Sequence, residues 1–102
     1  MKKLDTLEFR ETVEGGKGLM LVDFSATWCG PCKMQGPVLE ELEAEAAYKI
    51  YTVDVDESTE IASQYNINAV PSLLVFKDGV LKQSLVGFHP RAALEEEMKK
   101  FI

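Results

Sequence analysis

The two cysteines of the chain, Cys29 and Cys32, are separated only by Gly30 and Pro31. Two thiols at this spacing can form a redox-active disulfide, supply half of a zinc site, or simply fill space in the core. A structural zinc site needs four ligands, usually Cys or His, and the chain adds only His89 to the two cysteines. Redox chemistry is therefore the favoured interpretation.

The elements predicted around the cysteines give the two thiols different roles. A short apolar segment at residues 19–24 is typical of a buried strand, and a helix is predicted from Cys29 to about Tyr48. The first N–H groups of a helix have no internal partner and its dipole is positive there, so the Cys29 thiolate is favoured. Cys32 lies one turn further on, within disulfide reach and less exposed. We expect Cys29 to attack and Cys32 to resolve, with Pro31 stiffening the turn.

Asp23 interrupts the apolar strand between Val22 and Phe24. A buried carboxylate without a partner is costly, and desolvation raises its pKa toward neutrality, where it can exchange protons at working pH. The alternative is an Asp at a strand end that simply meets solvent. From the residues alone both interpretations stay open.

The remaining pattern predicts an α/β protein. Further strands are expected at residues 50–55, 72–77 and 80–86, the last two joined by an Asp78-Gly79 turn. Helices are expected at residues 5–14, ended by Gly15-Gly16, at residues 58–65 with a Ser cap, and after Pro90. At Gly87 we expect a bulge or a close backbone contact. Alternating strands and helices followed by a hairpin predict a mixed sheet with helices on both faces.

Composition narrows the function classes. With 102 residues, 46% of them apolar, the chain is expected to form one domain over residues 1–102. A net charge of −6 without basic runs argues against binding to nucleic acid or anionic membrane. No apolar stretch is long enough to span a bilayer or to serve as a signal peptide. We therefore expect a cytosolic monomer, in a compartment where thiols are kept reduced.

Four motifs together resemble the thioredoxin family over essentially the whole chain. They are "WCGPCK" after an apolar strand, "VPS" at residues 70–72, "KDG" at 77–79 and "VG" at 86–87. The resemblance implies the thioredoxin fold, a central mixed sheet flanked by helices on both faces. It also implies a protein-disulfide reductase with no cofactor of its own, which acts on disulfide-containing client proteins and is reset by a thioredoxin reductase using NADPH or ferredoxin.

The resemblance also implies roles for single residues. Cys29 matches the attacking cysteine and Cys32 the resolving one, and the two form the active-site disulfide. Trp28 matches the tryptophan that covers this disulfide, and Pro71 the family's cis-proline. Asp23 matches the aspartate that accepts the proton of the resolving cysteine through water.

Client binding is expected on an apolar surface around the thiols. Trp28, Val70, Pro71, Gly87 and Phe88 are expected to line it. Such a surface would hold an extended peptide mainly by main-chain pairing.

Some positions depart from common family members. Thr52 stands where a lysine often lies near the buried aspartate, and Lys49 should point to the other face of its strand. Ser72 and Gly36 replace a usual Thr and a frequent Ala.

Two other function classes stay open. An oxidant or isomerase on the same fold usually carries His between the cysteines, so Gly30-Pro31 speaks against that class. A binding module with incidental thiols is the third.

Overall fold

The computed structural model describes residues 1–102 and is built on a five-stranded mixed sheet in the order β1-β3-β2-β4-β5. The strands are β1 (Lys2–Lys3), β2 (Leu19–Ser25), β3 (Lys49–Asp54), β4 (Ser72–Lys77) and β5 (Val80–Val86). β3 runs parallel to β1 and β2, whereas β4 is antiparallel to both β2 and β5. β2, which leads into the cysteines, is therefore the central strand.

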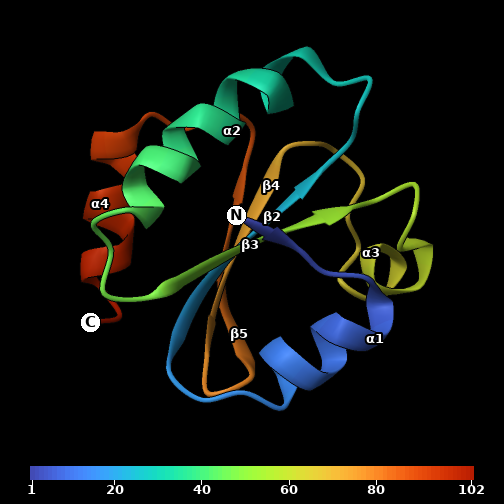
Figure 1. Cartoon of the computed structure of the whole chain (residues 1–102), viewed down its shortest axis with the longest axis horizontal. Coiled ribbons are helices and arrows are strands. Elements are labelled where there is room, and N and C mark those ends of the chain that lie inside the picture. Colours follow the sequence, from blue (N-terminus) through green and yellow to red (C-terminus); the bar gives the residue numbers. More distant parts are fainter.

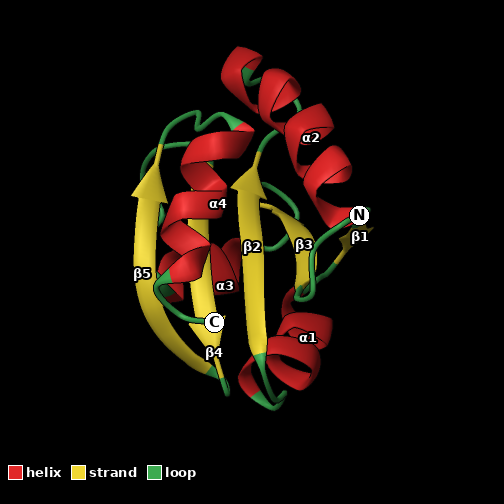
Figure 2. Ribbon diagram, turned by 90° about the vertical axis from the view of Figure 1, so that its left-hand side faces the viewer, coloured by secondary structure: helices red, strands yellow, loops and turns green.

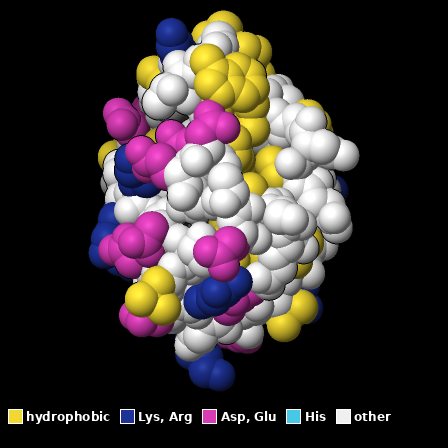
Figure 3. Space-filling model, turned by 90° about the vertical axis from the view of Figure 1, so that its right-hand side faces the viewer, with side chains coloured by type: hydrophobic (Ala, Val, Ile, Leu, Met, Phe, Trp, Pro, Cys, Tyr) yellow, Lys and Arg dark blue, Asp and Glu magenta, His cyan; other side chains and the backbone are white.

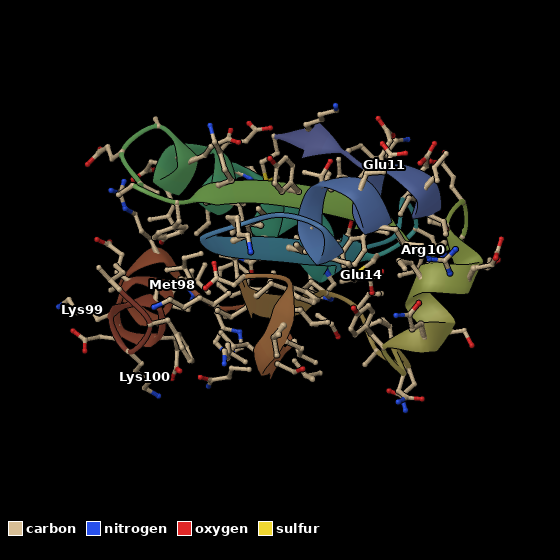
Figure 4. All side chains as sticks on the ribbon, turned by 90° about the horizontal axis from the view of Figure 1, so that it is seen from below. Arg10, Glu11, Glu14, Met98, Lys99 and Lys100 are labelled. Atoms are coloured by element: carbon tan, nitrogen blue, oxygen red, sulfur yellow. A yellow bond between two sulfur atoms is a disulfide. The ribbon has the colours of Figure 1, made fainter.

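Helices cover both faces of the sheet, as the sequence predicts (Figure 1). They are α1 (Thr6–Phe9), a short π-helix η1 (Arg10–Glu14), α2 (Gly30–Glu43), α3 (Thr59–Gln64) and α4 (Arg91–Lys99). Figure 2 shows α2 and α4 in front of the strands, while α1 and α3 lie behind them. Figure 4 labels Arg10, Glu11 and Glu14 on the α1–η1 side and Met98, Lys99 and Lys100 on the α4 side, with the sheet between them.

Each face of the sheet has its own core because strand side chains alternate between the faces. Val22 and Phe24 of β2 join Phe9 and Phe76 in the cluster beneath α1 and α3. Leu21 belongs to the cluster beneath α2 and α4. Residue 23 has the same parity as residue 21, so Asp23 lies on the α2 side.

The first helix begins where the sequence predicts. The carboxylate of Asp5 accepts a hydrogen bond from the backbone N–H of Glu8, and the Glu8 carboxylate accepts one from the backbone of Asp5, which makes a capping box. After one turn the α-helix widens into η1, which ends at Glu14 with Gly15 as its C-cap. The pattern predicted neither this change nor β1, whose residues show no apolar alternation.

The long helix differs from its prediction in length and in the face it buries. α2 ends at Glu43, with Ala44 as its C-cap, and not near Tyr48. Its buried residues are Cys32, Gln35, Leu39 and Leu42. Apolar residues repeat at Met34, Val38, Leu42 and Ala46, which predicts that this stripe is buried, but Met34 is 62% exposed. At its start the stripe is one position out of phase with the buried face, because the polar Gln35 takes the buried position.

Two smaller predictions have different outcomes: the Ser cap of α3 is wrong, and one of the two alternatives expected at Gly87 is confirmed. Ser58 is the N-cap residue of α3, but its side chain makes no capping hydrogen bond. The register of the β4–β5 pairing shifts between Val75 and Phe76, whereas Gly87, with φ +89°, follows the end of β5. The expected close backbone contact at Gly87 is confirmed, since its N–H donates to the carbonyl of Pro71 at 2.8 Å.

The Asp78-Gly79 turn docks against the end of η1 and gives a matched test of stability. Gly79 has φ +80° and an added Cβ would overlap the carbonyl oxygen of Glu14, whereas Gly18 has φ +85° and open space around it. We expect Gly18→Ala to cost about 1–2 kcal/mol for the left-handed backbone. Gly79→Ala should cost about 1–3 kcal/mol more because of overpacking. Urea unfolding of both variants measures the difference, and equal midpoints would contradict it.

Candidate active site

Cys29 occupies the N-cap of α2, immediately after the loop that follows β2. Its sulfur accepts a hydrogen bond from the backbone N–H of Cys32 (N···S 3.2 Å), and Pro31 lies in the first turn. An N-cap side chain satisfies one of the free N–H groups of the helix, and the helix dipole adds positive potential there. Both effects stabilise a negative charge on the Cys29 sulfur, as the sequence predicts.

Cys29 and Cys32 are joined by a disulfide across Gly30 and Pro31. The expected difference in exposure between the two cysteines is wrong for this oxidised form: Cys29 is 4% exposed and Cys32 7%. Both cysteines pack with Ala26 in a small buried cluster that Val55 and Val70 complete. The two cysteines therefore differ in the polar groups around their sulfurs and not in exposure.

The loop before β4 closes over the Cys29 sulfur. The Val70–Pro71 peptide bond is cis, as the family resemblance implies, and Pro71 is buried. The Val70 carbonyl oxygen lies 3.5 Å from Sγ of Cys29. The Pro71 carbonyl accepts from the N–H of Gly87. Three of the residues predicted for client binding, Val70, Pro71 and Gly87, are thus brought together beside the disulfide.

Trp28 and Phe88 bring aromatic surface to the site. Trp28 is 69% exposed and Phe88 37% exposed. The Trp28 indole Nε1 donates to Oδ2 of Asp56 at 2.7 Å, which restrains a ring that packing leaves free. Trp28 and Val70 also line a mostly apolar hollow with Val55, Ile67, Asn68 and Ala69. Figure 3 shows hydrophobic side chains gathered at the top of this face, the end of the molecule where α2 begins, with acidic groups below them.

Asp23 is buried in the middle of β2 and is 2% exposed. In the sheet it is flanked by Thr52 of β3 and Leu73 of β4. Its Oδ1 is a buried side-chain oxygen without a hydrogen-bond partner. Burial raises the pKa of Asp23 from 3.8 to about 7. The alternative of a solvated Asp at a strand end is therefore wrong.

Thr52, which stands where the family often has a lysine, does not pair with the Asp23 carboxylate. Its hydroxyl donates to the backbone carbonyl of Asp23 at 3.1 Å and lies 3.4 Å from Oγ of Ser25. Lys49 is paired with Met20, which belongs to the core on the opposite face, so its predicted orientation is confirmed. With no cation beside it, desolvation alone sets the pKa of Asp23.

Cys32 borders a polar hollow of about 240 Å³ on the α2 side of the sheet. Ser25, Thr52, Asp54 and Lys3 also line it, and the Lys3 ammonium is held by Glu57 at 2.7 Å. A polar cavity of this size has room for water. The structure therefore provides a space that can hold water beside Cys32, on the sheet face that carries Asp23.

Two residues of the site were missed by sequence reasoning. Asp56, which binds the Trp28 indole, carries no signal beyond its charge. Gln35 is fully buried on α2, and its amide binds the backbone of His89. A signal for Gln35 exists in its spacing, since residues 32, 35, 39 and 42 follow the period of one helix face.

The structure contains neither a metal-binding cluster nor a membrane-spanning helix. Nowhere in the chain do three or more His, Cys, Asp or Glu side chains gather closely enough to hold a metal ion. Nδ1 of His89 lies 2.8 Å from the carbonyl of Gly87. No helix has the length and apolar character needed to cross a membrane.

An α/β sheet that presents a Cys-Gly-Pro-Cys disulfide at a helix N-terminus, beside a cis-proline, defines a thiol-disulfide oxidoreductase. The thioredoxin family model matches residues 1–100. Thioredoxin of Bacillus subtilis is 47% identical over 93 residues, covering 89% of each chain. Thioredoxin of Staphylococcus aureus is 46% identical over 102 residues, covering 98% of this chain and 96% of the relative.

Solved structures agree with this assignment. A mutant thioredoxin from Halobacterium salinarum superimposes with a TM-score of 0.90 at 33% identity, covering 98% of this chain and 88% of that one. Thioredoxin of Malassezia sympodialis gives 0.88 at 35% identity, covering 99% and 90%. The chain belongs to the thioredoxin family and has the thioredoxin fold. It is a protein-disulfide reductase with a redox-active cysteine pair.

Proposed function

We propose that the protein is a general reductant of disulfides in client proteins, with Cys29 as the nucleophile, Cys32 as the resolving thiol and Asp23 as the proton acceptor. The observation that carries this proposal is the hydrogen bond from the Cys32 N–H to the Cys29 sulfur at the start of α2. It favours the thiolate at Cys29, and only a thiolate attacks a disulfide.

In the first step the Cys29 thiolate attacks one sulfur of a client disulfide. A mixed disulfide forms, the client S–S bond breaks, and the second client sulfur leaves as a thiolate that takes up a proton. Cys29 is buried beside the Val70 carbonyl, so we expect the client sulfur to reach it along the loop before β4.

In the second step the Cys32 thiol loses its proton to Asp23 and attacks the Cys29 sulfur. The mixed disulfide breaks, the first client sulfur leaves as a thiolate, and the Cys29–Cys32 disulfide forms. Two electrons pass from the cysteine pair to the client. The polar hollow beside Cys32 supports a route for this proton through water, and a pKa of about 7 lets Asp23 accept it near neutral pH.

Clients bind on the surface formed by Trp28, Val70, Pro71, Gly87 and Phe88. The exposed Trp28 and Phe88 supply apolar contact for the client. The backbone of the cis-proline loop, next to the Cys29 sulfur, supplies main-chain pairing for an extended client segment.

After each cycle the disulfide must be reduced again. A thioredoxin reductase, drawing on NADPH or reduced ferredoxin, supplies the two electrons. This requirement places the protein in a reducing compartment such as the cytosol. The protein acts as a monomer. Gly30 and Pro31 carry no positive charge, and a positive charge between the cysteines would stabilise the thiolate and so disfavour the disulfide.

The equilibrium reduction potential of the cysteine pair tests this proposal. We expect a potential more reducing than the cytosolic glutathione pool, measured in dithiothreitol buffers and followed by Trp28 fluorescence. The control is a Cys29→Ser/Cys32→Ser variant, whose fluorescence should not respond to the buffers. A more oxidising potential would contradict the reductant and favour an oxidant or isomerase.

A further inference from the structure

The amide of Gln35 ties α2 to the loop that follows β5. Its Nε2 donates to the carbonyl of His89 at 2.9 Å, and its Oε1 accepts from the N–H of the same residue at 2.8 Å. Gln35 is fully buried, and it lies one helical turn after Cys32. Both polar ends of one side chain are therefore used to hold a single loop residue.

The loop that Gln35 holds reaches the cis-proline through a second set of contacts. Nδ1 of His89 lies 2.8 Å from the carbonyl of Gly87. The N–H of Gly87 donates to the carbonyl of Pro71 at 2.8 Å. Hydrogen bonds thus connect α2, the segment 87–89 and the cis-proline loop, the three segments around the disulfide.

The segment itself has few other restraints. Gly87 has φ +89°, a backbone conformation that glycine adopts without steric cost. Phe88 is 37% exposed and Val86 64% exposed, so packing fixes neither side chain fully. Without Gln35 the segment between β5 and α4 would lose the two hydrogen bonds that hold His89 against α2.

We propose that Gln35 is a positioning residue for client proteins: its amide holds Gly87–His89 beside Pro71 in the arrangement that an extended client segment requires. This inference rests on the proposed use of that surface for client binding. A loop ordered in advance removes part of the entropy cost of binding. A small disulfide that meets only the Cys29 sulfur gains nothing from this order.

The test measures how fast the pre-reduced parent and pre-reduced Gln35→Met reduce a protein disulfide and a small-molecule disulfide. Methionine keeps the size and helix propensity of glutamine but cannot form either hydrogen bond to His89. We expect the second-order rate of insulin reduction to fall about tenfold, because the client must then order the segment itself. Reduction of 5,5′-dithiobis(2-nitrobenzoate) and the reduction potential should match the parent. Hydrogen exchange at the His89 amide should become faster.

The control is Gln64→Met on α3, away from the disulfide. This substitution removes the amide hydrogen bond from Gln64 to Glu14 of η1. It should leave all four measurements at parental values. Gln35→Leu serves as a second apolar replacement if Gln35→Met does not fold. Equal slowing of both disulfides, or an unchanged His89 exchange rate, would overturn the inference. A parent protein unable to reduce insulin would instead overturn the proposed function.

Discussion

Replacing Cys32 with serine is expected to stop turnover and to leave the protein covalently attached to its clients. The Cys29 sulfur of the variant still accepts a hydrogen bond from the backbone N–H of residue 32, so the thiolate is still favoured and still attacks. A serine hydroxyl cannot displace the client from the mixed disulfide. Non-reducing electrophoresis and mass spectrometry should show a one-to-one adduct with insulin that dithiothreitol removes.

The matched control is Cys29→Ser, which retains Cys32 at the first turn of α2 but removes the proposed nucleophile. It should be inactive and form no adduct. Cys32 lies inside the first turn of α2 and lacks the N-cap position that stabilises the Cys29 thiolate. If Cys29→Ser formed the adduct as fast as Cys32→Ser, the attacking role proposed for Cys29 would be wrong.

The parts of the fold that the sequence predicts best are those with local signals. The hairpin of β4 and β5 was predicted with its observed bounds because Asp78 and Gly79 both adopt positive φ, which an Asp-Gly pair favours. The capping box at Asp5 and Glu8 likewise marks the start of α1. In each case a few adjacent residues determine the backbone.

The features that were missed depend on distant partners. β1 is a strand because Lys2 and Lys3 pair with β3 at Tyr51 and Thr52, nearly fifty residues away in the chain. The end of α2 was misplaced because apolar spacing continues past the point where the chain turns toward β3. Pairing and chain direction are properties of the whole sheet, and periodicity along one segment does not contain them.

The residues of the site also divide into those with a local sequence signal and those without one. Asp23 was found from sequence because a carboxylate inside an apolar strand is conspicuous. Gln35 was not found, because a polar residue within a helix is usually assigned to the solvated face. Its role follows only from the position of His89, which α2 meets through tertiary folding. A buried polar group can thus be predicted when it interrupts an apolar strand, as Asp23 does. It cannot be predicted when its burial depends on a partner far away in the sequence, as for Gln35.

Replacing Asp23 with asparagine is expected to stabilise the protein while slowing its second step. The carboxylate is 2% exposed and unpaired at Oδ1, and its pKa is raised from 3.8 to about 7 by burial. The folded protein therefore holds this proton more tightly than the unfolded chain does. The difference between 3.8 and about 7 corresponds to about 4 kcal/mol at 1.36 kcal/mol for each pH unit.

The sign of the pH dependence follows from this difference. Below pH 3.8 the carboxyl is neutral in both states, and the parent should be as stable as Asp23→Asn. As pH rises toward about 7 the unfolded chain ionises first, so the parent loses stability, and above about 7 the loss is complete. Urea unfolding from pH 4 to 8 should show a gap that opens to about 4 kcal/mol in favour of the variant.

The matched control is Asp78→Asn, which keeps the oxygen that accepts from Gly18 and a side chain that tolerates positive φ. Its stability should follow the parent across this pH range. A parallel course for Asp23→Asn would show instead that the Asp23 carboxylate is paired or hydrated in solution.

Kinetics separate the proposed role of Asp23 in proton transfer from its effect on stability. The mixed disulfide formed by Asp23→Asn should resolve more slowly by on the order of 10²-fold, because Cys32 has lost its proton acceptor. In the parent, the rate of this step should fall as pH drops below about 7 and Asp23 becomes protonated. In the variant that inflection should be absent, and its persistence would assign proton acceptance to another group. Because the same unpaired burial raises the pKa and costs stability, the protein cannot gain one without the other at this position.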